Sequence, residues 1–245
     1  MVKVARYTVD HHCIVGNERI IVMISLQEFY DLDGDNRDRI KHEIFSNMKT
    51  LILATTNMDA VQTTSVLNAY MDNIVFKLED NIKENEALLQ CLKNDKYEQL
   101  IRIFSIKNDS CLIRNIVESV GLKSYYDLCR ICGLVHGTNV WKNNMELLFK
   151  TGQISQSDIV CFREDVLNHL VSYGISKERA MYYSEIIRKG AAYKLSDKDY
   201  QELEEHNVPH WFIEACKKIL YLPSKEMSDK YAWIIWRLLY IHYII

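Results

Sequence analysis

Helical periodicity is the feature that most constrains how this sequence can fold. From about residue 35 onward, apolar side chains recur at intervals of three and four, which places them on one face of an α-helix. Ile40, Ile44 and Met48 form one such face, and Leu67 and Met71 belong to another. Only 2 prolines interrupt the 245 residues. The sequence therefore predicts a mainly α, multi-helical fold.

The first 34 residues follow a different pattern. Two β-rich runs, VKVARYTV and RIIVMISL, are joined through a segment that contains VGNE. This arrangement is typical of a β-hairpin, so we expect a small α+β element before the helices. We divide the chain into a hairpin over 1–34, a helical segment of unknown relationship over 35–95, and a helical domain over 96–245.

Local signals mark the ends of several helices. The run DLDGDNRD departs from a calcium-binding loop at its sixth and twelfth positions, and we interpret it as a polar turn that caps the next helix. Ser124 with Asp127, and Ser196 with Asp199, have capping-box spacing. Glycines that follow helical runs are predicted as C-caps: Gly121, Gly133, Gly152, Gly174 and Gly190.

Net charge, cysteine count and the length of the apolar runs limit which partners and which cellular compartment fit this chain. The net charge is −3, so contacts with DNA have to rest on local basic groups. Seven cysteines, an odd number, and an N-terminus without a signal-peptide pattern indicate a reducing, cytoplasmic environment. The apolar run YAWIIWRLLYIHYII is shorter than the roughly 20 residues that a spanning helix needs. We predict no membrane association.

Cys129 and Cys132 have the C-x-x-C spacing of zinc ligands, and His136 follows them. A structural zinc site needs four ligands, and no second pair completes this one. Leu128 and Ile131 surround the thiols, which favours buried core cysteines. A metal site formed by Cys129, Cys132 and His136 is therefore the weaker interpretation. A reactive thiol is a further alternative. We expect no zinc cofactor.

The same stretch, extended to LCRICGLVHGTNVW, resembles the fingers region of the PolC-type DNA polymerase III α subunit of low-GC Gram-positive bacteria. The matching positions are Arg130, Ile131, Gly133, Leu134, His136, Gly137, Thr138, Val140 and Trp141. In that family the two cysteine positions tend to hold valine and serine. The cysteines are thus substitutions within the motif.

Four further segments resemble this family in the same order along residues 96–245: SCLIRNIVES, SDIVCFREDVLNHLVSYGI, IIRKGAAY and HNVPHWFIEACKKILYL. The matched charged positions include Arg163, Glu164, Asp165, Arg188 and Lys189, and Tyr231, Arg237 and Tyr240 match in the last helix. This collinear series implies a fingers-like helical domain.

Some positions depart from the family pattern. Arg114 keeps the second of two helix arginines, whereas Cys111 replaces the first. Lys225 is kept within PSKEM, but Pro223 and Met227 stand where the family has the phenylalanine and histidine that help shape the nucleotide pocket. The resemblance therefore implies that selection of a nucleoside triphosphate is no longer maintained.

The N-terminal hairpin resembles the last hairpin of the family's palm. In that alignment Met23 occupies the position of the third catalytic aspartate, and Asp31 and Asp33 lie in a turn instead of a strand. Polymerisation needs two metal ions held by palm carboxylates, and a chain of 245 residues has no room for a full palm. We expect no catalytic residues, no bound Mg–dNTP and no polymerase activity.

The resemblance also names candidates for binding phosphate or DNA. In the family, fingers side chains reach the triphosphate of the incoming nucleotide, and the retained candidates are Arg114, His136, Lys189, Lys225 and Arg237. A structural alternative exists for two of them. Arg237 lies in an apolar helix and would pair with a carboxylate, and Lys189 would balance a helix C-terminus.

Three functions follow from these observations. The preferred one is a catalytically inactive, PolC-like protein that engages replication proteins, as a regulator borne by a phage or mobile element. The second is an accessory that binds DNA or nucleotides, and the third is a split polymerase subunit completed by another chain. The sequence makes no prediction about the oligomeric state.

Overall fold

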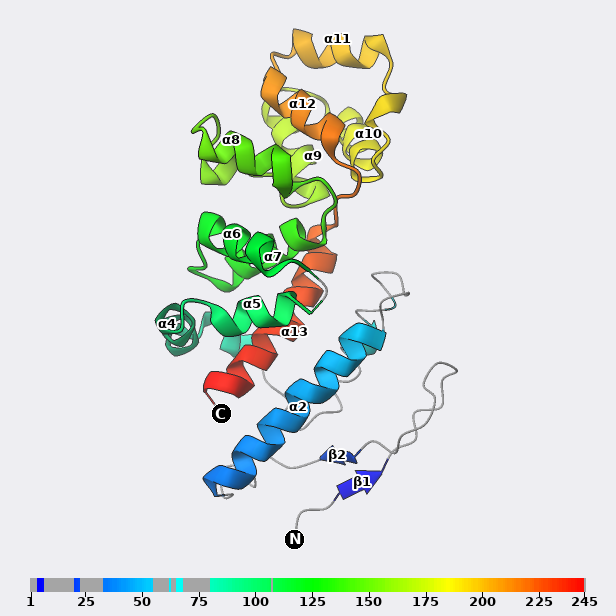
Figure 1. Cartoon of the computed structure of the whole chain (residues 1–245). Helices are drawn as coiled ribbons and strands as arrows, with labels where there is room; N and C mark the ends of the chain where they lie inside the picture. The colour runs from blue at the N-terminus through cyan, green and yellow to red at the C-terminus, as the bar shows by residue number, and fades with distance from the viewer. Residues whose placement is uncertain are drawn as a thin grey trace. The chain divides into compact units, whose positions relative to one another are not determined.

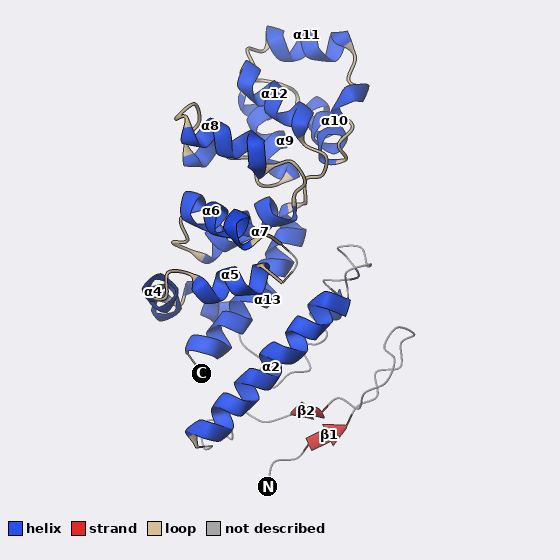
Figure 2. Cartoon of the chain, in the orientation of Figure 1, coloured by secondary structure: helices blue, strands red, loops and turns tan. Residues whose placement is uncertain are grey.

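A computed structural model describes residues 4–6, 20–22, 33–54, 62, 65–67, 80–106 and 108–244 of the protein. The described chain is mainly helical, as Figure 2 shows, which confirms the mainly α prediction. It divides into two compact units. One comprises Met1–Cys91 with Ile234–Ile245, and the other comprises Leu92–Trp233. The predicted boundaries after residues 34 and 95 stay predictions.

The first unit contains strands β1 (Val4–Arg6) and β2 (Ile20–Val22), which pair antiparallel with Val4 opposite Val22. The remainder of the predicted hairpin, including its loop and Met23, lies outside the described residues. The hairpin over residues 1–34 therefore stays a prediction beyond this short pair.

Helix α2 (Gly34–Ala54) follows the polar turn. The Asp33 carboxylate accepts the backbone N–H of Asn36 at 2.8 Å, which satisfies one of the donors exposed at a helix start. Ile40, Ile44 and Met48 are buried along the predicted apolar face. The capping and the periodicity predicted for this helix are both confirmed.

The same unit includes the short helix η2 (Asp80–Glu84), most of α4 (Glu86–Asn94) and the last part of α13 (Lys225–Tyr243). The Trp236 indole N–H donates to the Ile82 carbonyl oxygen at 2.8 Å, and both residues are buried. A buried indole N–H without a partner would cost free energy. This bond therefore favours one position of the tryptophan side chain.

The second unit is a succession of helices joined by short turns (Figure 1). Its helices are α5 (Glu98–Phe104), α6 (Ser110–Val120), α7 (Tyr125–His136), α8 (Glu146–Lys150), α9 (Arg163–Ser172), α10 (Lys177–Arg188), α11 (Asp197–Glu205), α12 (His210–Lys218) and the first part of α13. Shorter turns lie at Trp141–Met145, Gln156–Asp158 and Ala192–Lys194. Among the described helices of the chain, none is both long and apolar enough to cross a membrane.

The predicted helix starts in this unit are confirmed. Ser124 accepts the N–H of Asp127 at the start of α7, and Ser196 forms a reciprocal capping box with Asp199 at the start of α11. Four of the five predicted glycines follow helix ends with positive φ, which lets the chain turn without a Cβ clash: Gly121, Gly152, Gly174 and Gly190.

Gly133 was the exception, and its prediction as a C-cap is wrong. It lies inside α7, which continues to His136. A Cβ at this position would lie 2.5 Å from the carbonyl oxygen of Cys161 and 2.8 Å from the Phe162 ring. The glycine therefore allows a helix to pack directly on another segment's backbone, and it does not end the helix.

Helices α9 and α10 lie side by side (Figure 1) and share an apolar seam. Val166 and Leu170 on α9, and Tyr183 and Ile187 on α10, are buried. Burial of side chains of this size contributes about 1.5–3 kcal/mol each relative to exposure. This seam fixes the end of α10 relative to the start of α9, where charged residues gather.

We predict that Gly133→Ala lowers the free energy of unfolding by about 1–2 kcal/mol, because overpacking against Cys161 and Phe162 outweighs the higher helix propensity of alanine. Urea denaturation followed by circular dichroism measures this difference. Gly34→Ala is the control, since nothing lies within 4 Å of a Cβ there. A Gly133→Ala protein as stable as the wild type would contradict the packing argument.

Candidate functional site

The five candidate phosphate-binding residues lie on four helices and in both units. Arg114 is on α6, His136 ends α7, Lys189 follows α10, and Lys225 begins α13 in the Leu92–Trp233 unit. Arg237 lies further along α13, in the other unit. The first four candidates thus share one unit.

A chain of ion pairs and one backbone hydrogen bond leads from the Lys189 side chain to the backbone of Lys225. Lys189 Nζ lies 2.7 Å from Glu185 Oε1, and Arg163 Nη1 lies 3.9 Å from Glu185 Oε2. Arg163 Nε then contacts Glu164 Oε1 at 3.0 Å, while Glu164 Oε2 accepts the backbone N–H of Lys225 at 2.8 Å. The end of α10, the start of α9 and the start of α13 thus bring charged groups to one place.

Backbone hydrogen bonds hold these three helix ends together. Leu222 N–H donates to the Arg188 carbonyl, and Arg163 N–H donates to the Pro223 carbonyl, both at 3.0 Å. Gly190 has a φ of +67°, and a Cβ there would overlap the carbonyl oxygen of Leu220. The segment that leads into α13 therefore passes close to the end of α10 because glycine leaves room for it.

We define the basic surface as the four cationic side chains at this junction, which are Arg163, Arg188, Lys189 and Lys225. The adjoining carboxylates include those of Glu164, Glu185 and Glu226. The pKa of the Glu226 carboxyl is lowered by its hydrogen bond with Lys230 and, to a smaller extent, by the charge of Arg163. These cationic side chains gather at one junction in a chain whose net charge is −3. This is the kind of local basic group that the sequence required for a contact with phosphate.

The electrostatics of the basic surface centre on Glu185. Hydrogen bonds from Arg188, at 2.5 and 2.7 Å, and from Lys189 lower the pKa of the Glu185 carboxyl to about 2. The same contacts raise the pKa of Arg188. The carboxylate is therefore ionised at every pH at which the protein would ordinarily be studied.

An aromatic ring adjoins the basic surface. Lys225 Nζ lies 4.9 Å from the centroid of the Tyr126 ring on α7, and 47% of Tyr126 is exposed. An exposed ring beside cationic groups is the arrangement that proteins use to stack a base while they bind its phosphate. The basic surface and the adjoining ring therefore offer both cations for phosphate and an aromatic face for a base.

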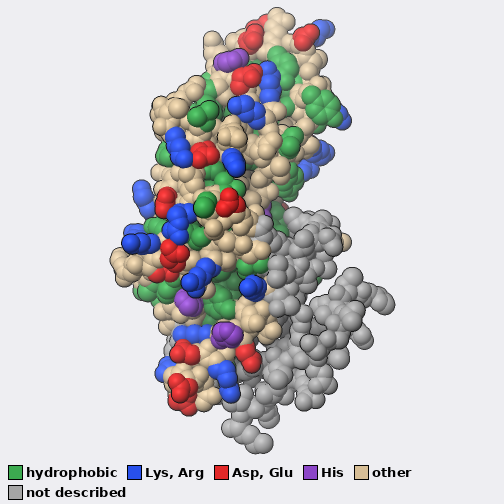
Figure 3. Space-filling model, viewed as in Figure 1, with side chains coloured by type: hydrophobic (Ala, Val, Ile, Leu, Met, Phe, Trp, Pro, Cys, Tyr) green, Lys and Arg blue, Asp and Glu red, His purple; other side chains and the backbone are tan. Residues whose placement is uncertain are grey.

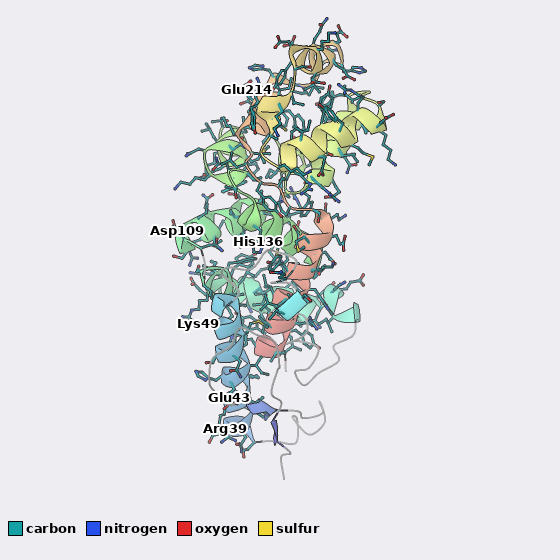
Figure 4. The ribbon with its side chains drawn as sticks, turned by 90° about the vertical axis from the view of Figure 1, so that its right-hand side faces the viewer. Arg39, Glu43, Lys49, Asp109, His136 and Glu214 are labelled. Carbon is teal, nitrogen blue, oxygen red and sulfur yellow. The ribbon has the colours of Figure 1, made fainter. Side chains whose placement is uncertain are left out.

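The other three candidates have local roles elsewhere. Arg114 pairs with Glu98 at 2.8 Å, and the ring of His136 stacks on Tyr231 with centroids 4.1 Å apart; Figure 4 labels His136. Arg237 is only 5% exposed. The structure therefore brings Lys189 and the backbone of Lys225 to one junction and does not place Arg114 or His136 with them, while Arg237 belongs to the other unit.

Two cations of the basic surface, and the side chains of Glu164, Glu185 and Tyr126 that adjoin it, were not among the predicted site residues. Arg163 and Arg188 were recognised as matches to the family but not as candidates, and Glu185 and Tyr126 were missed. The position of Glu185, three and four residues before Arg188 and Lys189, is a helical pairing that the sequence could have shown. No comparable signal connects Tyr126 with Lys225.

The C-x-x-C cysteines belong to the core. Cys129 and Cys132 are both buried in α7, and Cys129 Sγ donates to Asp229 Oδ1 at 3.6 Å. Burial, and then the neighbouring Cys129, raise the pKa of the Cys132 thiol well above its usual value. In the described part of the chain, no three His, Cys, Asp or Glu side chains form a group that could hold a metal ion. The arrangement supports the interpretation as core cysteines.

Known proteins resemble this chain over about half of its length. No protein-family model matches it. The protein named DNA polymerase III PolC-type from Thermotoga petrophila is 35% identical over 133 residues, or 54% of this chain. Its counterpart from Clostridium perfringens is 35% identical over 128 residues, or 52% of this chain. The chain carries a partial PolC-like region.

The shared stretch is a small part of those relatives. It corresponds to 10% of the Thermotoga petrophila protein and 9% of the Clostridium perfringens protein. The resemblance predicted from the fingers motifs is confirmed at the level of a PolC-like region. The activity of the relatives does not follow from so short a match, because function depends on particular sites.

We predict that a chelator leaves the melting temperature of the wild-type protein unchanged, because Cys129 and Cys132 serve as core residues. Cys132→Ala should lower the free energy of unfolding by about 1 kcal/mol through the lost buried volume, with or without chelator. Thermal and urea denaturation with and without EDTA make the comparison. A melting temperature that falls with EDTA in the wild type but not in Cys132→Ala would support a metal site instead.

Proposed function

We propose that this PolC-like chain is a binding protein that does not polymerise DNA by itself and that acts by engaging replication proteins. The observation that carries the proposal is the PolC-like region itself, which matches relatives at 35% identity over 133 residues. A shared surface of this kind would let the chain contact proteins that contact PolC. The role of a regulator borne by a phage or mobile element is part of the same proposal.

Substitutions at family positions support the proposed inactivity. Met23 stands at the aligned position of a catalytic aspartate, and a thioether cannot replace a carboxylate as a ligand for Mg²⁺. Cys111, Pro223 and Met227 replace the arginine, phenylalanine and histidine of the family's fingers. Such changes remove groups that bind or shape the site for a triphosphate, while the PolC-like scaffold remains.

The surface of the chain is consistent with protein partners. On the face in Figure 3, Lys and Arg side chains alternate with Asp and Glu side chains. Interspersed charges of both signs suit recognition of another protein through electrostatic complementarity. A long, uniformly basic groove would have favoured DNA as the main partner.

A specific observation favours a second candidate function, the binding of DNA or nucleotide phosphate. Lys189 and Lys225 were predicted separately, and contacts through Glu185, Arg163 and Glu164 lead from the Lys189 side chain to the backbone N–H of Lys225 at the basic surface. Arginine and lysine bind phosphate through charge and multiple donors. Tyr126 adds an exposed ring for a base.

For the preferred function, we predict that the purified chain with Mg²⁺ and dNTPs extends no primer. Added in excess to a reconstituted PolC reaction, it should reduce the rate of primer extension, because the two PolC-like surfaces compete for shared partners. Serum albumin at equal concentration is the control. Extension by the chain alone would overturn the proposed inactivity, and an unchanged PolC rate would count against shared partners.

For the second candidate function, we predict that the double variant Lys189→Gln/Lys225→Gln binds a labelled primer–template about tenfold more weakly at low salt, since it lacks two cations that face phosphate. Fluorescence anisotropy measures the affinity and its dependence on salt. The slope of log K against log salt should become shallower by about two, one for each lost phosphate contact.

Lys150→Gln is the matched control for this measurement. Lys150 pairs with Glu146 at 2.7 Å and a spacing of four residues, as Lys189 pairs with Glu185, but it lies on α8. The control removes one positive charge and the double variant removes two. A decrease in log K in the control that is half of the decrease in the double variant would therefore show that net charge, and not the basic surface, determines binding.

A further inference from the structure

The Glu185 carboxylate contacts cations from two helices. It accepts two hydrogen bonds from Arg188, at 2.5 and 2.7 Å, and lies 2.7 Å from Lys189 Nζ on the same helical segment. Its other contact is Arg163 on α9, 3.9 Å away. Three of the four cations of the basic surface therefore face one side chain.

The donors that Glu185 occupies are the ones that a phosphate group would use. An arginine fork binds the two oxygens of a carboxylate and the oxygens of a phosphate in the same bidentate manner. With Glu185 in place, the fork of Arg188 is already filled. A phosphate can reach these donors only when it displaces the carboxylate.

The ion pairs of Glu185 are exposed to solvent, so a phosphate can replace the carboxylate. The exposed fraction of the side chain is 41% for Glu185, 41% for Arg163 and 58% for Lys189. Exposed ion pairs contribute little to stability and are weakened by salt. The junction beneath them is held separately, by the backbone bonds between Leu222 and Arg188 and between Arg163 and Pro223. Removal of the Glu185 charge should therefore leave in position the helix ends that carry the cations, while their side chains become available to a ligand.

We infer that Glu185 acts as an internal substitute for phosphate, which suppresses binding of polyanions to the basic surface until a phosphate displaces it. This inference rests on the second candidate function, because it describes how the same surface is regulated. The ligand class is a chain or group of phosphates, supplied by a nucleic acid or by a free triphosphate.

A second glutamate provides a control for this role. Glu214 on α12, labelled in Figure 4, pairs with Lys217 at 2.7 Å, and its side chain is 42% exposed. It thus resembles Glu185 in exposure and in forming a helical ion pair. Glu214 forms its ion pair with a lysine of its own helix, whereas Glu185 also faces Arg163 on α9. Removing either glutamate changes the net charge by the same amount.

The experiment compares the full-length wild type with Glu185→Gln and Glu214→Gln. The probe is a fluorescein-labelled single-stranded oligonucleotide, measured by anisotropy over a series of salt concentrations. Glu185→Gln should bind about three- to tenfold more tightly than the wild type, with a slope of log K against log salt that steepens by about one. Glu214→Gln should change the affinity less than about twofold.

Inorganic triphosphate, added as a competitor, distinguishes the two sources of phosphate. Displacement of the oligonucleotide from Glu185→Gln at low concentrations of triphosphate would identify a compact phosphate site. If triphosphate displaces the oligonucleotide no better than an inert salt of the same ionic strength, the surface binds the phosphate backbone of a nucleic acid. Both outcomes support the inference, provided that the increase in affinity is confined to Glu185→Gln.

Other outcomes separate the inference from the function on which it rests. If the wild type binds and both glutamine variants bind equally tightly, the inference is wrong and the binding function stands. If neither the wild type nor Glu185→Gln binds at low salt, both are wrong. Circular dichroism confirms that the variants are folded, and Glu185→Ala repeats the test with a different side chain should the glutamine variant fail to fold.

Discussion

The close contact between α7 and the backbone at Cys161 and Phe162 is the constraint on which the Leu92–Trp233 unit depends. Gly133 makes this contact possible, since any Cβ would overlap the opposing segment. The Asp165 carboxylate also holds that segment, by accepting the N–H groups of Cys161 at 2.7 Å and Phe162 at 3.0 Å. Helix α9 begins at the next residue, Arg163, so its starting point is fixed by the packing of the core.

The charged surface is a consequence of that packing. Because α9 starts where it does, Arg163 and Glu164 face the segment that leads into α13, and Glu164 caps the N–H of Lys225. The seam between α9 and α10 then brings Glu185 and Lys189 to the same junction. A buried glycine contact thus determines which surface cations become neighbours.

The proposed function treats the scaffold and the chemistry of this PolC-like chain separately. The fingers motif around Arg130, Gly133 and His136 is kept, and its apolar residues form the core. The proposed function further assumes that positions which would contact or shape a triphosphate have changed, as at Cys111, and retained cations such as Lys189 are paired with carboxylates. This combination is the physical basis for proposing a binding protein that retains a polymerase-like framework.

Local interactions were determined by the sequence alone. Apolar periodicity and the caps at Ser124 and Ser196 act within about four residues, so their patterns could be recognised directly. The PolC resemblance was likewise present in the order of the motifs. Only the tertiary structure decided that Gly133 lies inside a helix and that Glu164 meets Lys225, 61 residues away. Such contacts depend on how whole helices pack, and residue spacing along the chain does not encode that geometry in a form that one sequence reveals.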